Sequence, residues 1–243
     1  MGCNEETGLK EIDENHNIDI LPETQNLQRI SKKIDFTKNN NEYITNCPKF
    51  FKNENNMRTF KENILTKENF SSDFLTSLQI KEENIEWKSA KEIFGGDVNI
   101  FGEKTSMNDI ILGPADNSYF VSAISSLANY PNIITQIFRT FKLPENNEPI
   151  EVCLKIEGNW TVVYLDDKFL VNKENNMTIF SYSPTKNIWG LILEKAWAKI
   201  NGGYEYIING KSKDVFDAFT PFRILEINLK KFEQELFWKY INT

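Results

Sequence analysis

Residues 193–205 read LEKAWAKINGGYE. With the residues just before it, this stretch predicts a helix over 187–200, because apolar side chains recur there at helical spacing. The apolar stripe consists of Trp189, Ile192, Leu193, Ala196, Trp197 and Ile200. The glycine pair Gly202-Gly203 follows the stripe and predicts the end of the helix.

The sequence around this helix predicts further helices and one β-hairpin. The expected elements are one or two short helices over 57–78, a mostly irregular stretch over 79–117, a buried helix from Ser118, a helix from Pro131 through Phe141, strands over 150–156 and 160–165 around a turn at Gly158-Asn159, a short strand over 179–182, and a helix over 229–240. Helices dominate and the sheet is small. The predicted fold class is therefore α+β.

Residues 1–56 differ in composition from the remainder. They are rich in Asn, Glu, Lys and Asp, and no helical or strand period holds there for long. Such a segment buries little apolar surface, so we expect an extended or disordered arm. The predicted organisation is a polar arm over 1–56 and a globular part over 57–243.

Charge and composition narrow the classes of function. The net charge of −7 gives no electrostatic support for nucleic-acid binding. The chain has 3 cysteines, and their odd number and wide spacing argue against a disulfide framework or a C-x-x-C zinc site. No segment reads as a signal peptide or a membrane span, which favours a cytoplasmic protein. The single histidine, His16, lies in the polar arm.

Four stretches together resemble the calpain family, specifically the first lobe of its papain-like protease core. LEKAWAKINGGYE at 193–205 is similar to the family's L-E-K-A-Y-A-K-x-N-G-x-Y-E, and GNWTVVYLDD at 158–167 to its G-x-W-x-x-V-x-V-D-D. IEWKSAKEI at 85–93 is similar to I-x-W-K-R-P-x-E-I, and FDAFT at 216–220 to E-D-F-T-G-G. They occur in family order, and the resemblance covers roughly residues 70–243.

The family's nucleophile motif, Q-G-x-L-G-D-C-W, is matched by LGPADNSY at 112–119. Ser118 stands at the position of the nucleophilic cysteine, and Leu112 stands where the family's glutamine donates to the oxyanion. A serine hydroxyl needs a strong base, and the resemblance implies that the His and Asn would come from a second lobe beyond residue 243. We therefore expect no catalytic residue here; Ser118 would instead serve in the first turn of its helix. A hydrolase would need a partner that supplies the histidine.

The resemblance also implies a calcium site in this lobe. Asp109 matches the family's acidic ligand, since 118 − 109 = 9 is the family spacing, and Asn187 stands where the family has a Glu. An amide in place of a carboxylate weakens calcium binding. The alternative is that Asp109 caps a loop and Asn187 caps the helix. Apart from this weak calcium site, we expect no cofactor.

Met1-Gly2-Cys3 could carry lipids, with myristoylation of Gly2 and palmitoylation of Cys3. The motif is imperfect, because position 6 is Glu6 rather than Ser or Thr. Two acyl chains would anchor the protein stably to a membrane. An ordinary start with a small second residue is the alternative.

These observations predict a catalytically inactive, calpain-like protein that binds or scaffolds protein partners. The expected setting is the cytoplasm, at a membrane or at a cytoskeletal assembly such as the microtubules of a cilium. Nucleic acid is not an expected partner. The alternative is a subunit of a calcium-dependent cysteine-type endopeptidase, completed by a partner chain that brings the His/Asn lobe.

Overall fold

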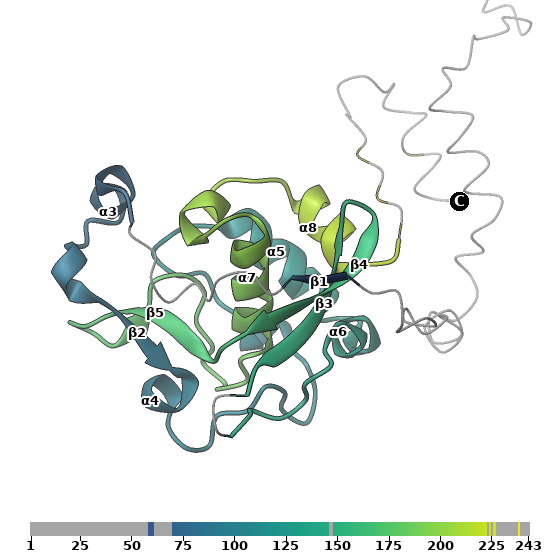
Figure 1. The fold of residues 1–243 in the computed structure, drawn as a ribbon, viewed down its shortest axis with the longest axis horizontal. Coiled ribbons are helices and arrows are strands. Elements are labelled where there is room, and N and C mark those ends of the chain that lie inside the picture. The colour runs from purple at the N-terminus through teal and green to yellow at the C-terminus, as the bar shows by residue number, and fades with distance from the viewer. Residues whose placement is uncertain are drawn as a thin grey trace, which may run out of the picture. The chain divides into compact units, whose positions relative to one another are not determined.

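A computed structural model describes residues 58–60, 70–145 and 148–222 and the single positions 224, 226 and 238 (Figure 1). The elements in chain order are β1 (Arg58–Phe60), α3 (Ser72–Leu78), η2 (Glu82–Asn84), β2 (Ile85–Ser89), α4 (Ala90–Phe94), η3 (Met107–Asp109), α5 (Ser118–Leu127), α6 (Pro131–Ile137), β3 (Ile150–Ile156), β4 (Asn159–Leu165), β5 (Lys168–Asn172), β6 (Met177–Thr178), α7 (Trp189–Ile200), η4 (Tyr204–Ile207) and α8 (Ser212–Phe219). Helices and small sheets share one core, which confirms the α+β fold class.

Helix α7 lies in the middle of the described region, with α5 beside it (Figure 1). Every residue from Trp189 to Lys199 is buried, so the helix is enclosed on all sides and not only along its apolar stripe. The enclosed residues include Glu194, Lys195 and Lys199, which have polar partners inside the fold. Charged side chains are tolerated at such depth only when they are paired.

The predicted hairpin is confirmed, with its turn one residue earlier than expected. Strands β3 and β4 pair antiparallel from Ile150 opposite Leu165 to Ile156 opposite Asn159. The two turn residues, Glu157 and Gly158, both have positive φ (49° and 80°). Two-residue hairpin loops favour this geometry because its twist matches that of the strands. Strand β1 extends this sheet by pairing parallel to β4.

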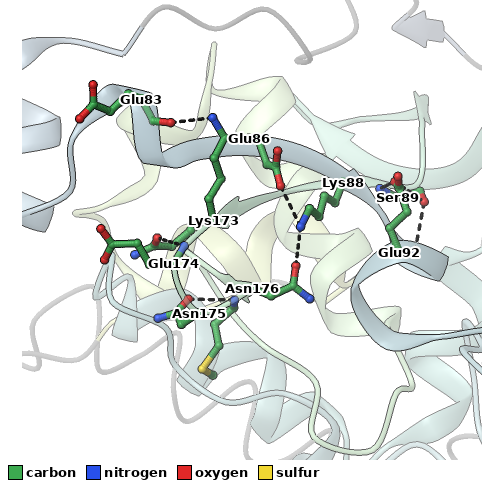
Figure 2. Close-up of polar contacts among 11 residues, drawn as sticks. Glu83, Glu86, Lys88, Ser89, Glu92, Lys173, Glu174, Asn175 and Asn176 are labelled. Carbon is green, nitrogen blue, oxygen red and sulfur yellow. Dashed lines mark hydrogen bonds and ion pairs between the residues drawn. The ribbon is translucent and has the colours of Figure 1, made fainter.

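A second sheet has the strand order β2-β5-β6. Figure 2 shows the polar contacts at its surface, where the Lys88 ammonium binds the Glu86 carboxylate at 2.8 Å and Asn176 Oδ1 at 2.7 Å. The Lys173 ammonium donates to the carbonyl of Glu83 at 2.6 Å. At the end of β2, Ser89 and Glu92 form a capping box that starts α4. The sheet is thus tied to its flanking turns by side chains as well as by its ladder.

Three of the four stretches that carry the resemblance meet at the side chain of Lys195. Its ammonium donates to the carboxylate of Asp166 and to the carbonyl of Lys168. It also lies 5.1 Å from the centre of the Trp87 ring, a cation–π distance. Burial lowers the pKa of Lys195, while the Asp166 carboxylate opposes that shift. The lysine therefore joins α7 to strands β2 and β5 of the second sheet.

The fourth stretch packs on the opposite part of the core. It forms the end of α8, and its Phe219 ring lies 6.0 Å from Phe120 on α5 and 6.1 Å from Trp197 on α7. The carbonyl of Thr220 accepts from the Lys155 ammonium at 3.2 Å. Helix α8 thereby links α5, α7 and the β3–β4 hairpin.

Several expected elements differ from those observed. Arg58–Phe60 is a strand, not helix, because β4 offers it a free edge. The stretch 79–117, expected to be mostly irregular, contains β2 and α4. Helix α6 ends at Ile137 instead of Phe141, because the backbone of Phe138 is extended and pairs with Val152. The strand expected over 179–182 is reduced to one bridge between Tyr182 and Ile111, and β5 was not expected. The helix expected over 229–240 lies outside the described residues, apart from position 238.

Candidate functional site

The segment that leads into Ser118 is held against residues 179–182 by backbone hydrogen bonds. Ile111 and Tyr182 exchange two of them, at 2.9 and 3.0 Å, and the N–H of Ala115 donates to the carbonyl of Ile179 at 3.0 Å. Gly113 lies so close that a Cβ there would stand 1.5 Å from the carbonyl oxygen of Phe180. The approach of this segment to the helix is therefore fixed by backbone contacts that require glycine.

Ser118 is the first residue of α5, as expected for a first-turn residue, and its side chain is exposed. The preceding Asn117 is the N-cap residue but makes no side-chain cap. Leu112 is 43% exposed, so the position of the family's oxyanion donor presents an apolar side chain to solvent. The described part of the chain contains no histidine, since His16 lies outside it. Here neither a base nor a glutamine amide accompanies the serine.

Asp116 keeps the backbone conformation that the motif requires. Its φ is +50°, in the left-handed region, where the family motif has glycine. Aspartate is one of the few other residues that adopt this region readily. The turn into α5 therefore survives the change of residue.

The side chain of Asn117 turns inward to a buried carboxyl group. Its Nδ2 donates to Glu194 Oε1 at 2.7 Å, and Glu194 also accepts from the N–H and the Oγ of Ser181, at 3.0 and 2.7 Å on Oε2. Burial raises the pKa of Glu194 to about 7, although the hydrogen bonds from Asn117 and Ser181 lower it. A carboxyl group that titrates near neutral pH thus lies behind the start of α5.

Tyr119, the residue after Ser118, is in contact with Trp197 of α7. Trp197 Nε1 donates to the Tyr119 hydroxyl at 2.9 Å. The family motifs have Trp at the position of Tyr119 and Tyr at the position of Trp197, so the two aromatic residues are exchanged here. A Cβ at Gly210 would stand 2.5 Å from the Tyr119 ring, which shows how closely the chain packs on it. The exchange keeps one indole and one phenol in contact.

The two calcium candidates are brought together. Asn187 Nδ2 donates to Asp109 Oδ1 at 3.1 Å, and Asp109 is 1% exposed. Within the described residues, no group of three or more His, Cys, Asp or Glu side chains could hold a metal ion. The carboxylate ends the short helix η3, where it completes a capping box with Ser106.

Cys153, the cysteine inside the described part of the chain, is not placed for catalysis. It lies in the middle of β3 with no exposed surface, and burial raises the pKa of its thiol to about 12. A thiol with this pKa is almost entirely protonated at neutral pH and is a poor nucleophile.

We expect Cys153 to resist alkylation in the folded protein because both its burial and its high pKa suppress attack. N-ethylmaleimide followed by peptide mapping should leave Cys153 unmodified under native conditions and modify it fully in denaturant. Rapid native labelling of this peptide would contradict the assignment.

Sequence reasoning identified Ser118, Leu112, Asp109 and Asn187 but missed Glu194 and Ser181 as partners of the site. A charged residue inside the apolar run 189–200 was the available signal, because such a residue needs an internal partner. Ser181 carried no signal, since its contact depends on how residues 179–182 fold. Gly2 and Cys3 lie outside the described residues, and their acylation stays a prediction.

Comparison with known proteins gives one family. The family model for calpain family cysteine proteases matches residues 54–243. A calpain of Schistosoma mansoni is 29% identical over 157 residues, covering 63% of this chain and 20% of that protein. Human calpain-14 is 29% identical over 160 residues, which cover 63% of this chain and 22% of calpain-14. The human calpain-2 catalytic subunit is 31% identical over 147 residues, which cover 58% of this chain and 20% of that subunit. The chain spans about a fifth of the length of these relatives.

Proposed function

This chain belongs to the calpain family of cysteine proteases, and we propose that within this family it acts by binding other proteins rather than by cutting them. The observation that carries the proposal is the exposed serine at the start of α5, in the place of the family's cysteine. A hydroxyl group gains too little from a helix N-terminus to ionise at neutral pH, whereas a thiol gains enough.

The second support is the apolar side chain of Leu112 at the position of the oxyanion donor. Loss of one such donor lowers the rate of a hydrolase by roughly 10²–10³. The change of nucleophile and the change of donor act on different parts of the reaction, so neither compensates for the other. The backbone of the site, with Gly113 and the left-handed Asp116, remains suited to the fold.

The surface around Ser118 supports a role in binding. Ile111 and Leu112 are neighbours in the segment that leads into α5, and each is 43% exposed, so this segment presents apolar side chains to solvent. Apolar groups of this kind, when contiguous and exposed, commonly contact partners. The proposed partner is a protein, at a cytoskeletal assembly or at a membrane reached through acylated Gly2 and Cys3. No helix in the described part of the chain has the length and apolarity to cross a membrane.

A completed protease subunit is the second candidate, and the exposure of Ser118 together with the neighbouring Tyr119–Trp197 contact favours it. In that case a partner would contribute the histidine that accepts the hydroxyl proton. The two candidates differ in one measurable property, which is hydrolysis that depends on Ser118.

We expect the purified full chain to release no fluorescent peptide from labelled casein above the blank, with or without calcium. Ser118→Ala should leave this result and the melting temperature unchanged, because the side chain is exposed and at most assists the first helical turn. Hydrolysis by the wild type that Ser118→Ala abolishes would establish an active serine and end the proposal.

The matched variant restores the two lost groups, as Leu112→Gln with Ser118→Cys. The wild type and this variant are each mixed with the separate His/Asn lobe of a calpain. Hydrolysis by the variant alone would show that the lost side chains disable a site that is otherwise intact. Hydrolysis by the wild type in the same mixture would favour the completed subunit.

A further inference from the structure

Both oxygens of the Asp109 carboxylate are occupied by donors of the protein itself. Oδ1 accepts from Thr185 Oγ1 at 2.6 Å and from Asn187 Nδ2 at 3.1 Å. Oδ2 accepts from the N–H of Ser106 at 2.8 Å and from Trp189 Nε1 at 2.8 Å. A carboxylate oxygen has about two lone pairs, so this one group is fully satisfied. The contacts tie η3 to the start of α7 at a buried point.

The side-chain amide of Asn187 contacts the Asp109 carboxylate and lies close to the backbone at Gly102. A Cβ on Gly102 would stand 2.6 Å from Asn187 Nδ2 and 2.9 Å from its Oδ1, so the amide lies directly against the backbone there. The neighbouring carbonyls are also engaged, because Asn99 accepts from the N–H of Ile188 at 2.9 Å and Ile100 from the N–H of Trp189 at 3.0 Å. Calcium needs 6–8 oxygen ligands at about 2.3–2.6 Å. The residues present do not fit that requirement.

We propose that the Asn187 amide takes the place of a calcium ion in this lobe. Its N–H donates to the Asp109 carboxylate, and the amide group packs against the backbone at Gly102. The amide is neutral and belongs to the chain, so the start of α7 is held in place without calcium. The inference concerns the assembly of the lobe and does not depend on whether Ser118 reacts.

The first test is calcium binding by the full chain. At about 100 times its Kd, a bound ion would raise the melting temperature of a chain of this size by about 5–10 °C. We expect a shift below about 1 °C between chelator and 10 mM calcium, as for a ligand with no site. Terbium gives a second readout, because an ion at Asp109 would lie beside the Trp189 indole and be sensitised by it. We expect no sensitised emission that depends on Asp109.

The second test is Asn187→Asp, which keeps the shape of the side chain and changes its charge. It sets two carboxylates about 3 Å apart, which destabilises the lobe unless a cation bridges them. We expect a melting temperature several degrees lower than wild type in chelator, recovery in calcium, and terbium emission on excitation of Trp189. The double variant Asp109→Asn with Asn187→Asp is the control and should lose the calcium response.

Two outcomes would overturn the proposal. One is a calcium shift or terbium emission of the wild type that Asp109→Asn abolishes. The other is a folded Asn187→Asp variant without any calcium response. If that variant folds only when refolded in calcium, the result supports the proposal. If it does not fold at all, the wild-type comparison with Asp109→Asn still decides.

Discussion

Gly113→Ala is expected to destabilise the protein by about 3 kcal/mol or more, the upper part of the range for overpacked sites. The added Cβ would stand 1.5 Å from the carbonyl oxygen of Phe180 and 2.9 Å from that of Ile179. Both obstacles are backbone atoms, so no side chain can rotate to make room. The segment 111–115 would have to leave residues 179–182 and lose the hydrogen bonds that join Ile111 to Tyr182.

Thermal unfolding measures this effect. A loss of about 3 kcal/mol lowers the melting temperature of a chain of this length by about 6–12 °C. Gly96→Ala is the matched control, because a Cβ at Gly96 meets nothing within 4 Å. That control should stay within about 0.5 kcal/mol of wild type. Equal melting temperatures for the two variants would show that the segment does not pack as closely as described.

The segment 112–118 contains positions that the fold requires and positions that the family uses for hydrolysis. Gly113 matches the family motif, and Asp116 replaces its glycine with a residue that still adopts positive φ. Leu112 and Ser118 differ from the motif, and both are exposed, so the fold places no demand on them. Requirements of packing are met throughout the loop, while two side chains that the family motif carries are replaced. A role in binding would explain this difference, because binding needs the fold but not the side chains of hydrolysis.

The sequence predicted the parts of the fold that follow from local pattern. Helices α5 and α7 and the β3–β4 hairpin have strong periodicity or turn signals, and each appears close to the expected residues. Strand β2 was missed although Ile85–Ser89 begins with alternating apolar and polar residues, because this run is only five residues long. Residues 179–181 are buried beneath the segment 111–115, whose backbone bonds to Ile179 and Tyr182, and only Ile179 also bonds to β5, at Leu170.

The candidate site was predicted in its positions but not in its contacts. Ser118 and Leu112 could be placed because a motif of eight residues fixes their spacing. The resemblance placed Asp109 and Asn187 at one calcium site, and the two side chains do meet across 78 residues of sequence, but the direct bond from Asn187 Nδ2 to Asp109 Oδ1 was not predicted. The identity of the amide donor was nevertheless readable, since an Asn stands where the family has a Glu.

We expect Glu194 to make the stability of the protein depend on pH between about 4.5 and 7. Burial raises its pKa from 4.5 to about 7, so the folded protein holds a proton that the unfolded chain releases in this interval. The stabilisation is complete below pH 4.5 and is lost as the pH rises through 7. A shift of this size corresponds to about 3 kcal/mol, at 1.36 kcal/mol for each pH unit.

Glu194→Gln isolates the contribution of this one group. Glutamine cannot ionise, its carbonyl can accept from Ser181, and its NH₂ can donate to Asn117 Oδ1, which is buried and has no partner among the described residues. Urea unfolding at pH 4.5 and pH 7.5 should show that the stability of wild type relative to the variant falls by about 3 kcal/mol. Using the difference between two proteins removes the titration of all other groups.

Glu103→Gln serves as the control, because Glu103 is exposed, and its curve should follow wild type within about 0.5 kcal/mol. The prediction fails if wild type and Glu194→Gln keep a constant difference across this interval. In that event the carboxyl group would already be ionised below pH 4.5, and the hydrogen bonds from Asn117 and Ser181 would outweigh its burial. If the predicted slope is found, the group behind the start of α5 is a neutral acid in mildly acidic conditions and an anion above pH 7. The N-cap residue of the helix then has a partner whose charge follows the pH.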